Sequence, residues 1–431
     1  MFYFFNLPGH VGKRTAACSL LFFSIIVATP GYGVEETRSI SLQEAVDRTL
    51  SSNPELQAFG YQLKAQEGRI QQAGRSPSPE LSLEMADALG SGDYEGLENA
   101  QTSISIGWVL ERGIRQRHIN AARAGSELIS IERDIKRFDV AAETARRYLV
   151  SLALQARLEN ADKTVRLSAE TIEAVEKRVK AGRTPEAELS RAQAELEVQN
   201  LTRKGLMYQR HQANLQLAAL WGTTTLDFSR VEGDILSLPQ LEPLAVLTSN
   251  LLNNPVFERF LSNQRLKQAE LELALAQDTP SWKLNAGVRR FEGSDDLALM
   301  AGFSIPIGER TKNPGRVLEA RTHLEAIDME KTKTRLYAES SLHVLYEKVQ
   351  HGIFVIKTTK ESILPKLEEA LAGTRRAYNL GRYGYLELQS VQAELLGAHE
   401  SLIEASIDVH QNIIEIERLT GMSIAHPRTE L

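Results

Sequence analysis

The chain has 431 residues, of which 42% are hydrophobic and 25% are charged, and this composition excludes a disordered protein. The formal net charge is −6 and no basic cluster stands out, so nucleic acid is not an expected partner. Aromatic residues make up only 6% of the chain, whereas helix-forming residues such as Ala, Leu and Glu are abundant. This composition indicates long helices more than a compact core.

Residues 1–33 have the pattern of an export signal. Lys13 and Arg14 precede the apolar run TAACSLLFFSIIVA, which is too short to span a bilayer. Small residues follow, so we predict a secretory signal peptide cleaved near Ala28 or Gly33. The alternative is a genuine membrane anchor.

Cys18 is the one cysteine of the chain and lies inside this first segment. Most of the apolar run follows it, whereas a lipidated cysteine comes after such a run, so we do not predict lipidation. The mature chain then has no cysteine for a disulfide or a thiolate metal site. No later segment reaches the length of uninterrupted apolar residues that a transmembrane helix needs.

A duplication governs the rest of the sequence. AGRTPEAELSRAQAEL, which begins at Ala181, recurs as LGRYGYLELQSVQAEL, which begins at Leu380, at an offset of 199 positions (380 − 181). SSNPELQAF and LNNPVFERF match in the same order at nearly the same offset. Because internal repeats set the architecture, we predict two copies of one unit, at 34–233 and 234–424, followed by a tail at 425–431.

Each copy begins with a helix and continues with a β-hairpin. The first helix is expected at Leu42–Ala73 in copy one and at Leu244–Gln277 in copy two, and an Asn-Pro pair restarts it in each. Apolar and polar residues then alternate with the period of a strand, in two segments joined by a loop rich in Gly and Asp. This pattern predicts hairpins at 79–110 and 281–307, hence four strands per chain.

Two long helices follow each hairpin and meet at the repeated glycine. They are expected at 115–181 and 184–221 in copy one, and at 317–380 and 384–420 in copy two. About 65 helical residues would extend roughly 100 Å. The last helix has the spacing of a coiled-coil seam, as opposed to an ordinary amphipathic helix, at Leu388, Val391, Leu395, Leu402 and Val409.

Four strands cannot close a barrel or hide their edges, so an exported chain of this kind is expected to assemble with copies of itself. Three chains would supply the strands of an outer-membrane barrel with an aqueous lumen. The strands alternate as such a barrel requires, since Leu81 and Leu83 flank Ser82. Trp108 and Trp282 suit either an aromatic girdle at the membrane interface or a plain protein core.

The duplicated plan resembles the outer membrane efflux protein family, the TolC-like channels, over nearly all of the mature chain, and so does the turn motif YNLGRYGYLELQSVQAEL, which begins at Tyr378. VLERGIRQRHINAARA and SIPIGERTKNPGRVLEAR resemble the branch that works with heavy-metal efflux pumps of the cobalt–zinc–cadmium type. The resemblance implies a mainly α fold with a β-barrel part. Three chains would form a 12-stranded barrel in the Gram-negative outer membrane and a long α-helical tunnel in the periplasm.

The implied function is a passive exit duct in a tripartite efflux system. A periplasmic adaptor of the membrane fusion type and an inner-membrane RND-type pump would deliver substrates, among them heavy-metal cations. A duct for drug efflux or type I protein secretion is the nearest alternative. A periplasmic adaptor would have one hairpin flanked by compact β domains, and a structural coiled-coil protein would need neither strand pairs nor an export signal.

The resemblance also assigns roles around the repeated turn. Glu188 and Glu387 each follow the turn glycine by six positions (188 − 182, 387 − 381), and with Tyr378 and Arg382 they are implied at a periplasmic aperture. Ser390 stands where the family's best-known pattern has a second acidic residue. The alternative is a solvated glutamate that the helix dipole favours. The turns implied to contact the adaptor comprise Gly182, Arg183, Gly381 and Arg382.

No pattern of catalysis is present. The nine histidines show no HxH or HExxH spacing. No nucleophile elbow and no glycine-rich phosphate loop occurs. We therefore expect no catalytic residue, no cofactor, no metal site and no enzymatic activity.

Overall fold

A computed structural model describes residues 38–111, 113–277, 281–307 and 313–422. Residues Arg38–Leu431 form one compact unit, so elements of both repeats belong to the same body. The predicted signal peptide at 1–33, with Cys18, and the predicted tail at 425–431 lie outside the described residues.

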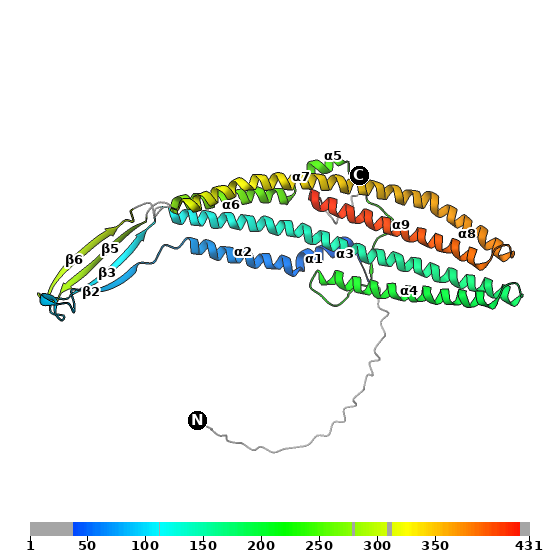
Figure 1. Ribbon diagram of the computed structural model, residues 1–431, viewed down its shortest axis with the longest axis horizontal. Coiled ribbons are helices and arrows are strands. Elements are labelled where there is room, and N and C mark those ends of the chain that lie inside the picture. Colours follow the sequence, from blue (N-terminus) through cyan, green and yellow to red (C-terminus); the bar gives the residue numbers. More distant parts are fainter. Residues whose placement is uncertain (1–37, 112, 278–280, 308–312, 423–431) are drawn as a thin grey trace, which may run out of the picture. The chain divides into compact units, whose positions relative to one another are not determined.

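The two hairpins join in one antiparallel sheet with the order β2-β3-β5-β6 (Figure 1). Copy one contributes β2 (Glu80–Ala86) and β3 (Gln101–Leu110). Copy two contributes β5 (Trp282–Phe291) and β6 (Asp296–Ser304). These four strands fall inside the two predicted hairpin ranges, and the pairing of β3 with β5 connects the repeats.

Two further strands were not predicted from the sequence. β1 (Ser39–Ile40) and β4 (Arg230–Val231) form a short parallel pair. The Tyr148 hydroxyl lies 2.9 Å from the carbonyl oxygen of Ile40 and 2.6 Å from that of Glu232, so it connects the two strands to α3 (Ile114–Lys180).

The Asn-Pro pairs end one helix and start the next, as predicted. In copy one α1 (Leu42–Ser52) gives way to α2 (Pro54–Ala73), and the Asn53 side chain accepts hydrogen bonds from the first backbone N–H groups of α2. In copy two α5 (Leu244–Leu251) gives way to α6 (Pro255–Gln277), where Asn254 accepts from Val256 N at 2.8 Å.

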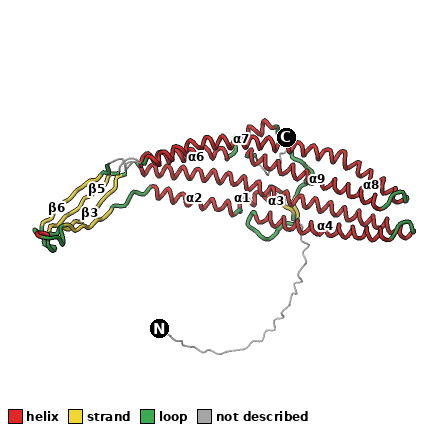
Figure 2. Tube along the Cα trace, viewed as in Figure 1, coloured by secondary structure: helices red, strands yellow, loops and turns green. Residues whose placement is uncertain are grey.

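The long helices make up most of the described chain (Figure 2). Copy one has α3 (Ile114–Lys180) packed on α4 (Glu186–Ala219). Copy two has α7 (Pro314–Thr358), a π-helical turn at Thr359–Ile363, and α8 (Leu364–Asn379), all packed on α9 (Tyr385–Thr420). The π turn ends two residues before Pro365, whose ring cannot fit a regular α-helical interior.

The predicted coiled-coil seam of the last helix is confirmed. Leu388, Leu395, Leu402 and Val409 are buried, and the last three of them pack against Leu342, Val349 and Ile356 of α7. Gly352 lets the two helices approach closely, because a Cβ atom there would lie only 2.4 Å from Val409 Cγ2.

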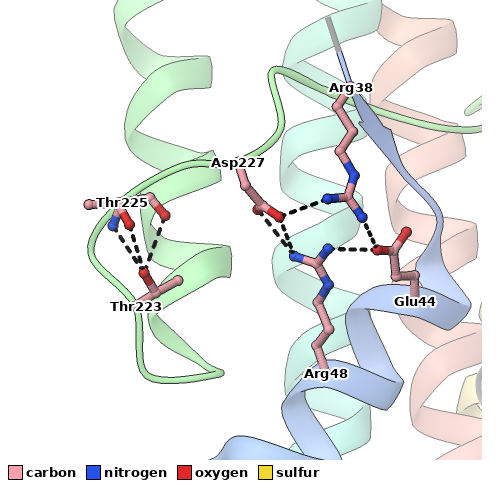
Figure 3. A network of polar contacts seen from close by, with 6 residues as sticks. All are labelled: Arg38, Glu44, Arg48, Thr223, Thr225 and Asp227. Carbon is pink, nitrogen blue, oxygen red and sulfur yellow. Dashed lines mark hydrogen bonds and ion pairs between the residues drawn. The ribbon is translucent and has the colours of Figure 1, made fainter. Parts of the chain in front are cut away.

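A polar network fastens the N-terminal part of the described chain to the loop after α4 (Figure 3). Asp227 accepts hydrogen bonds from Arg38 at 3.2 Å and from Arg48 at 2.8 Å, and Glu44 binds both arginines in turn. Each side chain is partly exposed, so the network orients these segments more than it stabilises the fold.

Candidate functional site

The four-stranded sheet exposes an apolar face. Cross-strand partners share a face, and the register aligns Leu83 with Ile104, Ile104 with Val288, and Val288 with Leu299. A second row on this face aligns Trp108 with Leu284 and Leu284 with Phe303. Many of these side chains are exposed, with Leu299 at 89% and Phe303 at 74%.

The opposite face is polar, and its side chains on the central strand β3 are better covered. Ser103, directly between Glu84 and Arg289 in the register, is only 3% exposed. Arg289 spans two positions on this face, since its Nε donates to Ser103 Oγ at 2.9 Å and its Nη1 to Gln101 Oε1 at 3.1 Å. A sheet whose large apolar side chains are exposed, while Ser103 on its polar face is buried, is inverted relative to the sheet of a water-soluble protein.

Both outer edges of this sheet are open in the part of the chain that the structure describes. The strand β2 pairs only with β3, and β6 pairs only with β5. The unpaired backbone N–H and C=O groups of an open edge can form hydrogen bonds with a strand of another chain. Trp108 and Trp282 are 41% and 43% exposed, so neither lies in a core of the single chain.

The two helical hairpins turn at glycines with left-handed backbone conformation. Gly182 has φ of +66° and Gly381 has φ of +78°, which only glycine adopts without strain. Arg183 N donates to Arg178 O, and Arg382 N donates to Ala377 O, both at 2.9 Å. The same hydrogen-bonding pattern, a Schellman turn, therefore ends α3 and α8, and this is the physical reason for the repeated glycine.

The paired glutamates lie in the first turns of α4 and α9 but differ in their surroundings. Glu188 is half-buried and accepts a hydrogen bond from the Thr184 hydroxyl at 2.7 Å. Glu387 is exposed and folds back toward Gly384. Both carboxylates are near a helix N-terminus, whose dipole favours negative charge.

Tyr378 is fully buried where the two hairpins meet. The Arg178 guanidinium lies over its ring, with Cζ 4.2 Å from the centroid, and donates to the backbone oxygens of Tyr378 and Tyr383. Burial raises the pKa of Tyr378; the charge of Arg178 opposes this rise, while that of Glu188 adds to it.

A small apolar cluster joins the hairpin tips around this tyrosine. Its buried members come from all four helices, namely Val175, Ala192, Tyr378, Tyr385 and Leu388. The structure thus brings together Tyr378 and Glu188 of the predicted set, and leaves Arg183, Arg382 and Glu387 exposed. Sequence reasoning missed Arg178, because copy two has Ala377 at the matching position and the contact spans 200 positions of the chain.

A groove of about 520 Å³, lined by both polar and apolar side chains, lies between α3, α4 and α9. Arg157 of α3 reaches across it to Glu400 of α9 at 2.6 Å, and Gln392 donates to Thr171 at 2.9 Å.

Within the described residues, no group of three or more His, Cys, Asp or Glu side chains surrounds a common point suited to a metal ion. Over the same residues, none of the helices is long and apolar enough to cross a bilayer.

Comparisons with known proteins match the chain to a family model and to a curated relative. Residues 45–223 match the model of the family described as outer membrane efflux protein. The cobalt-zinc-cadmium resistance protein CzcC of Cupriavidus metallidurans is 24% identical over 397 residues, which are 91% of this chain and 92% of that protein.

Solved structures share the fold. The outer membrane protein VceC from Vibrio cholerae has a TM-score of 0.69 at 17% identity, over 89% of this chain and 96% of that one. CusC has a TM-score of 0.64 at 17% identity, over 89% and 92%. The Campylobacter jejuni CmeC outer membrane channel has a TM-score of 0.67 at 14% identity, over 89% and 87%.

Proposed function

We propose that this chain, whose residues 45–223 match the outer membrane efflux protein family, is a member of that family and the passive outer-membrane exit duct of a tripartite efflux system. The duct lies in the outer membrane of a Gram-negative cell and extends into the periplasm. An inner-membrane RND-type pump and a periplasmic adaptor deliver its substrates. The chain itself serves as a conduit and not as an enzyme.

The observation that carries this proposal is the inverted sheet. Its exposed apolar face suits lipid, and its polar face suits a water-filled lumen. The open edges of β2 and β6 can pair with β6 and β2 of neighbouring copies, so three chains of four strands close a 12-stranded barrel. Trp108 and Trp282 lie at the strand ends next to α3 and α6, where an interfacial girdle is expected.

The helical hairpins form the periplasmic tunnel in this assembly, and their tips form its aperture. Three chains place three copies of Glu188, Glu387, Tyr378 and Arg382 around the opening. A ring of carboxylates attracts cations and repels anions. The exposed turns at Gly182-Arg183 and Gly381-Arg382 are the surfaces that meet the adaptor.

Divalent metal cations are the proposed cargo. The support is the similarity to a protein named for cobalt-zinc-cadmium resistance, which extends over nearly the whole of both chains. The cargo is selected by the pump, so the duct needs only a cation-tolerant path.

Single-channel recording in a planar bilayer tests the duct and its aperture together. The purified protein is expected to insert as a trimer with a small, cation-selective conductance that rises in Glu387→Ala, because the exposed carboxylate then no longer narrows the opening. Glu186→Ala is the matched control, since Glu186 lies in the first turn of α4 but outside the proposed ring. A well-folded protein that neither forms trimers nor inserts would contradict the proposal.

A further inference from the structure

The long helices of this chain form a layer with two edges. The helix α4 packs on α3, α3 packs on α9, and α9 packs on α7 and α8, so α4 lies at one edge and α7 with α8 at the other (Figure 1). Large apolar side chains are exposed mainly at these edges. Among the described residues, α4 has four of them and α7 has six, whereas α3 and α9, between the edges, have one each. An exposed apolar patch of this kind marks a surface that another molecule covers.

The apolar side chains at each edge lie on the side of the helix opposite its neighbour in the layer. On α4, Tyr208 precedes the buried Leu217 by nine residues (217 − 208), which is about two and a half turns. On α7, Phe354 is about 200° around the helix from Ile356, which packs toward α9. Tyr208 and Phe354, 73% and 66% exposed, therefore face the place where the next helix of the layer would lie.

The exposed side of α4 has the spacing of a coiled-coil seam. Ala194, Val198, Leu201, Gly205 and Tyr208 follow one another at intervals of four and three, and all five are exposed. A Cβ atom at Gly205 would meet nothing within 4 Å, so another helix has room to approach the backbone there. The seam is thus spaced like the buried seam of α9 but is left open in the part of the chain that the structure describes.

The tips of the two helical hairpins are level with each other. Arg178 Cζ lies 4.2 Å from the ring centroid of Tyr378. These residues come four and three positions before the glycines of their turns, Gly182 and Gly381 (182 − 178, 381 − 378). Residues at equal distances from the two turn glycines therefore lie at equal heights above the tips, at 1.5 Å per residue.

Apolar residues of the two edges share the same heights. Leu201 comes 19 positions after the glycine of its turn, and the exposed Ile363 comes 18 before the other (201 − 182, 381 − 363). Tyr208 comes 26 positions after its glycine, and Phe354 comes 27 before the other (208 − 182, 381 − 354). The two edges thus carry matching apolar positions roughly 28 Å and 40 Å above the tips.

We propose that α4 of one copy packs against α7 and the π turn of the next copy, with Tyr208 on Phe354 and Leu201 on Ile363. The two surfaces belong to different edges, so the contact is head-to-tail, and contacts of this kind close into rings. A partner that lay across the layer, such as a helix of the adaptor, would need apolar side chains on α3 and α9 as well. The proposal rests on the proposed function and names the surfaces through which the copies meet below the barrel.

The open strands lie at the same two edges. The helix α2 continues the edge of α4, because Asn53 at its start donates to Leu220 O at the end of α4 at 2.8 Å, and the chain passes from α2 into β2. At the other edge the chain passes from β6 into α7. A copy that pairs its β6 with β2 of its neighbour therefore brings its α7 beside α4 of that neighbour.

Disulfide cross-linking of the purified full chain in detergent, in a Cys18→Ser background, tests this seam. Oxidation of Tyr208→Cys/Phe354→Cys should give a covalent product of three chains, because each copy offers one cysteine to each neighbour. Either variant alone should stay uncoupled, since each cysteine then faces the native residue of the next copy. A disulfide dimer of Tyr208→Cys alone would show a two-fold contact and overturn the proposal.

Gln209→Cys/Lys357→Cys is the matched control. Both residues are exposed and lie at similar heights, 27 and 24 positions from their turn glycines (209 − 182, 381 − 357), but on other sides of their helices. This pair should not cross-link, while light scattering should report a trimer for both double variants. A trimer that does not cross-link through positions 208 and 354 would overturn the seam and leave the duct standing. A protein that stays monomeric would contradict both.

Discussion

The close contact between α7 and α9 makes a sharp prediction for two glycines. Gly352→Ala places a Cβ atom 2.4 Å from Val409 Cγ2, far below a normal contact distance. Val409 is fully buried and β-branched, and a β-branched side chain in a helix has one strongly preferred rotamer, so it cannot turn aside. The overpacking should cost about 1–3 kcal/mol.

Gly373→Ala is the matched control. Gly373 is inside α8, and a Cβ atom there would meet nothing within 4 Å. The substitution should stabilise the helix by up to about 1 kcal/mol, because alanine is the better helix former. The same gain partly offsets the clash at Gly352, so the two variants should differ in free energy of unfolding by about 1–3 kcal/mol.

Thermal unfolding of the two variants beside the wild type gives the answer. Gly352→Ala should have the lower Tm of the two, and Val409→Ala should relieve the clash, so that the double variant is more stable than the sum of single effects implies. Equal stabilisation by both glycine substitutions would refute the close packing of α7 on α9.

Three further predictions concern the tips, pH and the sheet. Arg178→Met removes the cation over Tyr378, a contact that contributes about 1 kcal/mol, and should speed chymotryptic cleavage at the tips severalfold. Arg183→Met, at an exposed turn residue, should leave the cleavage rate unchanged. Burial lowers the pKa of His410, whose Nε2 is 3.0 Å from Ile235 O. Its neutral form therefore stabilises the fold above the ordinary histidine pKa, and this stability is lost as pH falls through the lowered pKa. Tm should drop on acidification, and it should drop less in His410→Gln. Leu299→Arg on the apolar face should cost about 2–4 kcal/mol in the bilayer and reduce the yield of inserted trimer, while Ala298→Arg on the opposite face of the same strand should be tolerated.

Local chemistry made much of the fold predictable. The Asn-Pro pairs carry both the cap and the proline that starts the next helix, so the sequence alone shows where α2 and α6 begin. Alternation by two shows the strands, because each has one apolar and one polar face. The glycine of each helical turn is visible because only glycine fits the positive φ there.

Contacts between distant segments were not predictable in this way. The two-residue strands β1 and β4 are too short to show a period, and Tyr148 joins them only in three dimensions. Arg178 meets Tyr378 across the interface of two hairpins, where nothing in the local sequence marks the pair. The different surroundings of Glu188 and Glu387 depend on Thr184, which copy two replaces with Tyr383.

The orientation of the sheet is the central claim, and spin labels can measure it directly. Cys18 is the one cysteine of the chain, so Leu299→Cys and Ala298→Cys in a Cys18→Ser background each give one label on adjacent, oppositely facing positions of β6. For protein in lipid vesicles, the account predicts that the label at 299 is relaxed mainly by oxygen, which dissolves in lipid, and the label at 298 mainly by a water-soluble nickel complex. Equal access of the nickel complex to both labels would contradict a lipid-facing sheet, and with it the outer-membrane duct.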